Sequence, residues 1–141
     1  MIEWYKMAFE KYADFQTRST RNEFWWFFLA NIIIVFGVNI AAGMISMILD
    51  TPGIAIAASV LIVIYYLAIF IPYLAVSIRR LHDTNRSGWN LLFGLIPFIG
   101  AIILIVFYAQ ESDPRPNKWG PVPGKSHDLE DALVDFDEDL V

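Results

Sequence analysis

Three long stretches without a charged side chain limit what this chain can fold into more than any other feature. They cover residues 24–49, 53–78 and 89–110. A stretch of ~18 or more mostly apolar residues is typical of a helix that spans a membrane. Hydrophobic residues make up 57% of the chain, above the ~45–50% usual for soluble domains. The sequence therefore predicts an all-α membrane protein, a small bundle of three transmembrane helices over about residues 24–49, 54–78 and 89–108.

The segment before the first stretch, residues 1–23, consists of an amphipathic helix pattern over 1–17 and a capping segment that follows it. At about 100° per residue, its large apolar side chains share one face and its charged side chains the other. The apolar face consists of Trp4, Tyr5, Ala8, Phe9, Tyr12 and Phe15. We expect an interfacial helix that lies on the membrane surface, and the alternative is that this face packs against the protein's own loops. Thr20 and Glu23 then have the spacing of a capping box, which predicts the start of the first span.

The third stretch carries two residues that interrupt a helix, Pro97 and Gly100. Two arrangements fit this pattern. A complete third span would place the C-terminal tail outside the cell, whereas a hairpin that re-enters and returns would keep the tail in the cytoplasm. We expect the complete span, because bent backbone exposed to lipid leaves polar groups unsatisfied.

The distribution of basic residues predicts the orientation. The N-terminal segment has four Lys/Arg, the turn at 50–53 has none, and the loop at 79–88 has three. By the positive-inside rule, the N-terminus and the 79–88 loop lie in the cytoplasm. The tail, residues 111–141, is polar, contains prolines and then becomes acidic. Its composition predicts disorder after residue 124, and the alternative is a docking motif that folds on a partner.

Five arginines gather on the predicted cytoplasmic surface, in two clusters without lysine. They are Arg18, Arg21, Arg79, Arg80 and Arg86. A planar guanidinium can bind phosphate in two places, so these residues predict a site for anionic lipid headgroups. The alternative is a structural clasp, in which Arg79 pairs with Asp83 and Glu23 ties the first helix to the loop.

Little in the chain indicates catalysis. Cysteine is absent, there are two histidines, and no motif for a metal or cofactor appears, so we expect neither. A membrane enzyme would use His82 and Asp83 as a base with its orienting acid, but adjacent residues rarely face each other. We expect membrane lipids, a second copy or a membrane-protein partner to be bound, and no nucleic acid. An oligomeric channel or transporter subunit is the second hypothesis, with a pore lined by Asn31, Asn39 and Ser46.

Four motifs, in order along the chain, resemble a known family. They are Phe15-x-x-Arg18-x-x-Arg21-x-Glu23-Phe24-Trp25-Trp26, Arg79-Arg80-Leu81-His82-Asp83-x-x-Arg86-Ser87-Gly88-Trp89, Ile96-Pro97-x-x-Gly100 and Asn117-x-x-Gly120-Pro121-x-Pro123. Through these motifs, residues 4–123 resemble the domain-of-unknown-function family 805, small bacterial inner-membrane proteins. The resemblance implies a multi-pass location in that membrane and a small helical bundle, and it implies no activity. The acidic segment after Gly124 lies beyond the family pattern, and Asn85 stands where glycine is common.

These observations predict a non-enzymatic membrane component that binds anionic lipid headgroups or a protein partner through an arginine-rich cytoplasmic face. Arg79, Arg80 and Arg86 would contact phosphate or a partner's acidic groups, with the other two arginines assisting. The histidine and aspartate between them would fix the loop. If the tail is cytoplasmic, its motif at 117–123 can meet the arginine loop and form one composite site.

Overall fold

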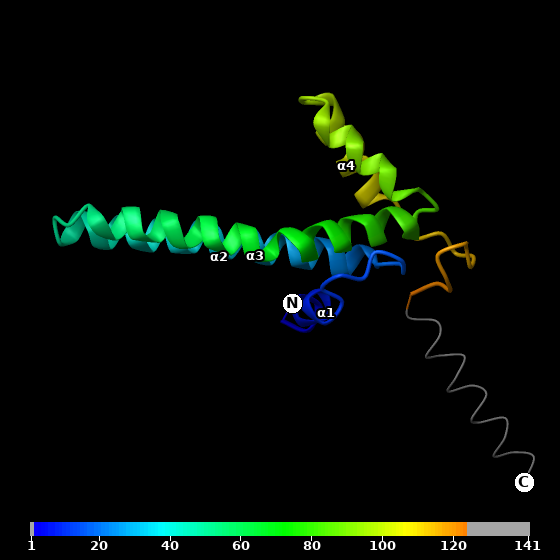
Figure 1. Cartoon of the computed structure of the whole chain (residues 1–141), viewed down its shortest axis with the longest axis horizontal. Helices are drawn as coiled ribbons and strands as arrows, with labels where there is room; N and C mark the ends of the chain where they lie inside the picture. Colours follow the sequence, from blue (N-terminus) through cyan, green and yellow to red (C-terminus); the bar gives the residue numbers. More distant parts are fainter. Residues whose placement is uncertain (1, 124–141) are drawn as a thin grey trace, which may run out of the picture.

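The computed structural model describes residues 2–123, and it is helical throughout its regular parts. Its elements follow the order α1 (Ile2–Glu10), α2 (Arg21–Ile48), α3 (Gly53–Asp83), a 3-10 helix η1 (Gly88–Leu95) and α4 (Ile99–Ala109). Figure 1 shows α2 and α3 side by side as one long antiparallel pair, with α1 crossing that pair and α4 leaning away from it.

The α2–α3 pair forms because both segments are apolar and uninterrupted over their length. At 1.5 Å per residue, helices of 28 and 31 residues reach about 42 and 46 Å, more than the ~30 Å hydrocarbon core. They are the two helices within residues 2–123 that are long and apolar enough to cross a membrane. Asp50, with φ 50°, and Pro52 make the turn between them. The first two predicted spans are therefore present as helices.

The start of α2 follows the predicted capping pattern in part. Thr20 is the N-cap, and its hydroxyl accepts a hydrogen bond of 3.1 Å from the backbone N–H of Glu23. The carboxylate of Glu23 binds Arg79 on α3 instead of reaching back to Thr20. The local cap thus also ties the first turn of α2 to the last turns of α3.

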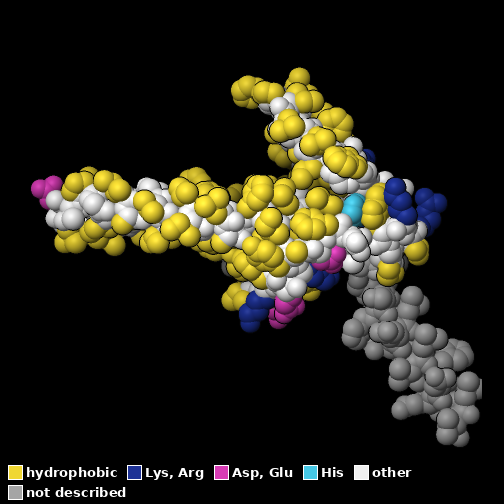
Figure 2. All heavy atoms as spheres, in the orientation of Figure 1, with side chains coloured by type: hydrophobic (Ala, Val, Ile, Leu, Met, Phe, Trp, Pro, Cys, Tyr) yellow, Lys and Arg dark blue, Asp and Glu magenta, His cyan; other side chains and the backbone are white. Residues whose placement is uncertain are grey.

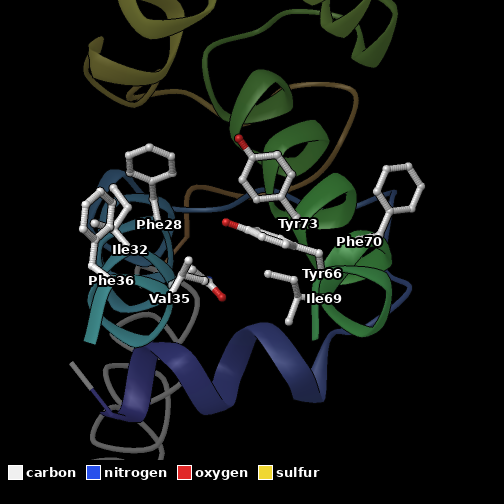
Figure 3. Close-up of a pocket in the computed structure, with 9 residues that line it drawn as sticks. Phe28, Ile32, Val35, Phe36, Tyr66, Ile69, Phe70 and Tyr73 are labelled. Carbon is white, nitrogen blue, oxygen red and sulfur yellow. The ribbon is translucent and has the colours of Figure 1, made fainter. Parts of the chain in front are cut away.

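The amphipathic helix α1 packs on the protein's own helices, whereas the alternative had named its loops. Tyr5 stacks on Phe27 of α2 at 5.5 Å, and its hydroxyl lies 2.9 Å from that of Tyr65 on α3. Tyr12 donates a hydrogen bond to the carbonyl of Ala68. Figures 1 and 3 show α1 running across the α2–α3 pair. This direction suits a helix in the plane of a membrane surface, which stays a prediction.

The third apolar stretch is not one helix, contrary to the span predicted over 89–108. The chain reverses at Pro97, which has no N–H to donate, and at Phe98, whose φ is 61°. Gly100 fits against the carbonyl of Phe93, where a Cβ atom would lie 1.7 Å from the oxygen. The two arms, η1 and α4, pack on each other as a hairpin. With 11 residues, α4 is about 16 Å long, too short to cross a bilayer alone.

The hairpin returns the chain to the end of α3 that carries the arginines. The N–H of Asp113 donates a hydrogen bond of 2.9 Å to the carbonyl of Asp83, and the Asn117 side chain donates one to the carbonyl of His82. Residues 110–123 therefore lie at the same end of the α2–α3 pair as the segment before α2. This arrangement corresponds to the re-entrant alternative. The predictions for the tail after residue 124 fall outside the described residues.

This arrangement gives a topology prediction that exploits the absence of cysteine. We expect single cysteines at Gln16 and at Lys118 to be protected from an impermeant thiol reagent in right-side-out sealed vesicles, because both lie at the predicted cytoplasmic end. A cysteine at Thr51, in the turn at the far end of the pair, should be labelled. Opposite labelling of positions 16 and 118 would show that the third stretch crosses the membrane completely.

Candidate functional site

Five charged side chains form a buried cluster at the end of the α2–α3 pair. They come from the segment before α2, the first turn of α2 and the last turns of α3, and none is more than 4% exposed. We call this cluster the clasp, and it consists of Arg18, Glu23, Arg79, Arg80 and Asp83. Lys, Arg, Asp and Glu are almost never fully buried unless they are paired, and the pairing in the clasp is extensive.

Asp83 lies at the centre of the clasp. Its Oδ1 atom accepts from Arg18, with 3.0 Å to Nε and 2.9 Å to Nη2. Its Oδ2 atom accepts from Arg80 and from the hydroxyl of Ser112. One buried carboxylate therefore joins three segments of the chain: the residues before α2, the end of α3 and the residues after α4.

The two arginines on Asp83 also hold the chain that returns from the hairpin. Arg80 donates from Nε to the carbonyl of Tyr108 at 3.0 Å, and from Nη2 to the carbonyl of Gln110. Arg18 donates to the carbonyls of Asp113 at 2.7 Å and Arg115 at 2.9 Å. The last carbonyls of a helix lack partners within the helix and attract cations. The clasp therefore satisfies the C-terminal end of α4 and fixes the base of the hairpin.

Arg79 is the least satisfied member of the clasp. Its Nη1 atom lies 2.6 Å from Oε1 of Glu23, but its Nε and Nη2 atoms are buried and have no hydrogen-bond partner. The predicted Arg79–Asp83 pair is wrong, because Asp83 pairs with Arg80 three residues before it. Three guanidinium groups and two carboxylates leave the clasp with one excess positive charge.

Asp14, a carboxylate outside the clasp, has a lowered pKa. Burial disfavours the charged form of Asp14, but hydrogen bonds from the Thr17 hydroxyl and from backbone N–H groups outweigh that effect. Together with the positive charge of Arg79, they hold the pKa of Asp14 below its ordinary value. Asp14 is therefore charged at neutral pH and compensates Arg79 only from a distance.

His82 contacts the Asn117–Gly120 turn of the tail and does not act with Asp83. Its Nδ1 atom lies 3.2 Å from the carbonyl of Thr17, and its ring stacks on Trp119 with centroids 4.4 Å apart. Asn117 and Gly120 close that turn through two backbone hydrogen bonds. Because Asp83 is occupied by Arg18, Arg80 and Ser112, the two neighbours do not form a base–acid pair. The tail motif and the arginine loop do meet, as expected for a cytoplasmic tail.

The two remaining arginines lie outside the clasp and beside α4. Arg21 is exposed, and its Nη1 atom is 3.4 Å from the carbonyl of Ala109. Arg86 is half-buried, and its guanidinium lies 4.2 Å from the ring centre of Phe107. Neither forms an ion pair with any residue in the described range 2–123. Figure 2 shows charged side chains gathered at this end of the molecule, in contrast to the hydrophobic surface of the long pair.

Several residues of the recognised motifs have structural roles near the hairpin. Ser87 is the N-cap of η1, and its hydroxyl accepts from the N–H of Trp89. Gly88 lies so close to α3 that a Cβ atom would come within 2.9 Å of Ile78. Trp26 and Trp89 are exposed, as an interfacial belt requires, and Trp25 packs edge-on against Phe24. Pro121 is exposed just after the Asn117–Gly120 turn.

An apolar groove, which we call the seam groove, follows the junction of α2 and α3. Its wider part, about 460 Å³, lies between the pair and the η1–α4 hairpin. Its deeper part, about 340 Å³, lies between α2 and α3 alone (Figure 3). Phe28 and Tyr73 line both parts, so the two parts lie next to each other along the pair. No local sequence pattern indicates this groove, because it forms between segments that are distant in the chain, and its wider part also needs the hairpin to fold back.

The polar residues proposed for a pore are bonded within the chain. Asn31 is buried, donates to the carbonyl of Phe27 and accepts from the Tyr65 hydroxyl at 2.5 Å. Asn39 and Ser46 are hydrogen-bonded to the carbonyls of Val35 and Thr51. Asn31 thus joins α2 to α3, while Asn39 is exposed on the surface of α2.

Comparisons with known proteins agree with the resemblance found from the motifs. Residues 12–121 match the family model described as protein of unknown function (DUF805). Inner membrane protein YhaH of Escherichia coli (strain K12) is 41% identical over 122 residues, which are 86% of this chain and 97% of that protein. Inner membrane protein YhaI of the same strain is 40% identical over 123 residues, 86% of this chain and 96% of that protein. No solved structure matches the chain significantly.

Proposed function

This chain belongs to the DUF805 family of proteins of unknown function, and from that premise we propose that it is a non-enzymatic component of the bacterial inner membrane. Its arginine-rich face lies in the cytoplasm and binds the phosphate of anionic lipid headgroups. The two long apolar helices and the printed names of its relatives support the membrane location. The residues that bind phosphate differ from the first expectation, because Arg79 and Arg80 are buried.

The observation that carries this proposal is the position of Arg21 and Arg86. Arg21 is exposed and Arg86 is half-buried, neither has an ion-pair partner among residues 2–123, and both contact α4 near its C-terminal end. Arginine is well suited to phosphate because its planar fork can donate two parallel hydrogen bonds. The exposed tryptophans at the same end support a position of these arginines at headgroup level.

The clasp supports this role in two ways. It fixes the base of α4, and with it the positions of Arg21 and Arg86. It also carries one excess positive charge, and the unpartnered Nε and Nη2 atoms of Arg79 leave that charge incompletely compensated. A buried charge that is not fully paired is costly, so a nearby anion stabilises the folded protein.

The proposal predicts that Arg21→Gln with Arg86→Gln removes most of the bound anionic lipid. Each hydrogen bond to a charged group contributes about 1.5–3 kcal/mol, so losing two contacts reduces binding by more than about tenfold. The measurement is the amount of anionic phospholipid that co-purifies with the full chain in detergent, per mole of protein.

The matched control is Arg115→Gln with Lys118→Gln, which changes the net charge by the same amount on the same face. Both side chains are exposed, and within residues 2–123 neither forms a hydrogen bond with α4. We expect this control to retain its lipid. Equal loss in both double variants would mean that only total charge matters, and the proposed role of Arg21 and Arg86 would be wrong. Complete displacement of lipid by millimolar inorganic phosphate would point to a soluble phosphate ligand instead.

A further inference from the structure

The seam groove and Arg21 lie along the same face of α2. Trp25, Phe28, Ile32 and Phe36 line the groove at spacings of three or four residues, which places them on one stripe of the helix. Arg21 comes four residues before Trp25 and so heads the same stripe. The seam groove is therefore a long apolar groove on the protein surface, with the guanidinium group of Arg21 at one end.

The length of the groove corresponds to one leaflet of a bilayer. From Phe24 to Phe36 an α-helix advances about 18 Å, while half of the ~30 Å hydrocarbon core is about 15 Å. The arginine end lies with the exposed tryptophans and the charged residues, where headgroups would be. The other end lies within the hydrophobic length of the α2–α3 pair. An acyl chain that starts at headgroup level would fill the groove to its end.

The lining of the groove matches a hydrocarbon chain. It is aromatic and aliphatic, and its one amide, that of Asn31, is already bonded to Phe27 and Tyr65. A ligand in the groove would therefore be held by apolar contact and shape. The charge at the head of the groove selects a ligand with an anionic group at one end, which is the chemistry of an anionic phospholipid.

We propose that the seam groove binds one anionic phospholipid of the cytoplasmic leaflet, with an acyl chain between α2–α3 and the η1–α4 hairpin and the phosphate at Arg21. This inference rests on the proposed headgroup binding and adds a specific, stoichiometric site for the lipid chain. It assigns the hairpin a role as one wall of a lipid site, since Ala101 and Leu104 of α4 face the groove.

The test is native mass spectrometry of the full chain released from detergent, with dioleoyl phosphatidylglycerol as the probe. We expect one lipid adduct per chain in the wild type. Ala101→Trp fills the wider part of the groove and should lower its occupancy at least tenfold. Ile102→Trp, at the next position and exposed away from the groove lining, is the matched control and should bind like the wild type.

A second measurement needs no substitution. Dihexanoyl phosphatidylglycerol has the same headgroup but chains too short to fill the groove, so the wild type should bind it at least tenfold more weakly than the dioleoyl lipid. Dioleoyl phosphatidylcholine, which has no net charge, should also bind more weakly. These comparisons remain decisive if Ala101→Trp does not fold.

The outcomes separate this inference from the proposed function. Equal binding of long and short anionic lipids, with loss on Arg21→Gln, would leave the headgroup proposal intact and overturn the groove. Equal binding of phosphatidylglycerol and phosphatidylcholine would overturn the selection for a headgroup with a net negative charge, and with it both proposals. An adduct that Ala101→Trp does not change would also overturn the groove. If the groove instead takes a helix of a protein partner, no lipid adduct will appear, and this inference is wrong.

Discussion

Replacing Asp83 with asparagine is expected to unfold the end of the protein that carries the clasp. The change removes the buried carboxylate that Arg18 and Arg80 share, and it leaves three guanidinium groups against the single carboxylate of Glu23. Removing one partner of a buried ion pair costs about 3–5 kcal/mol, because the remaining charge stays buried without compensation. Asparagine has nearly the same size as aspartate and keeps one acceptor oxygen, so the loss of stability would result from the loss of the negative charge. Thermal unfolding in detergent, followed by near-ultraviolet circular dichroism, measures it.

Asp113→Asn is the matched control for that experiment. Asp113 pairs with Arg115 at 3.8 Å, and the Arg115 side chain is 85% exposed. An exposed ion pair contributes about 0–1 kcal/mol, so this variant should unfold close to the wild type. The contact that Asp113 makes with Arg18 uses its backbone carbonyl, which the substitution keeps. Similar unfolding temperatures for Asp83→Asn and Asp113→Asn would contradict the central role of Asp83.

Replacing Gly100 with alanine is expected to open the η1–α4 hairpin. The added Cβ atom would lie 1.7 Å from the Phe93 carbonyl oxygen and 2.7 Å from its carbon, so backbone must move. Overpacking usually costs about 1–3 kcal/mol, and a clash with backbone lies at or beyond the upper end of that range. The measurement is the distance between spin labels at Leu92 and Ile105, on the two arms, which should increase and broaden.

Gly37→Ala provides the control, because a Cβ atom at Gly37 meets nothing within 4 Å. Alanine is favoured over glycine in a helix by about 1 kcal/mol, so this variant should be at least as stable as the wild type. A hairpin distance that stays unchanged in Gly100→Ala would show that the close contact with Phe93 is not what shapes the turn.

The sequence predicts the parts of this fold that depend on neighbouring residues. The lengths of α2 and α3 follow from uninterrupted apolar stretches, the turn between them from Asp50 and Pro52, and the start of α2 from the Thr20 cap. Each of these features depends only on residues close to it in the sequence. Local composition and spacing were therefore sufficient to predict them.

The hairpin depends on contacts that no local pattern contains. Pro97 and Gly100 indicated a break, but the cost of unsatisfied carbonyls argued for a straight span. In the structure, guanidinium groups that are distant in the sequence supply the missing hydrogen bonds at Tyr108, Gln110 and Asp113. Because these hydrogen bonds satisfy the carbonyls, the cost of unsatisfied backbone no longer opposes a returning chain at this end of the hairpin.

The arginines were misplaced for a related reason. The positive-inside rule put all five on a cytoplasmic surface. Three of them are buried and paired with carboxylates, and for two of these three the partner is distant in the sequence. Glu23 lies 56 positions from Arg79, and Asp83 lies 65 positions from Arg18. Ser112 and Tyr108, which complete the clasp, belong to no motif that marks them beforehand.

The clasp also orders the events of biosynthesis. Its parts range from Arg18 to the carbonyl of Arg115, so it cannot close until residue 115 has left the ribosome. Before then, α2 and α3 can insert as a pair while Arg18 and Arg80 stay hydrated. A chain truncated before Tyr108 would leave Arg18 and Arg80 without the backbone carbonyls that they bind in the closed clasp.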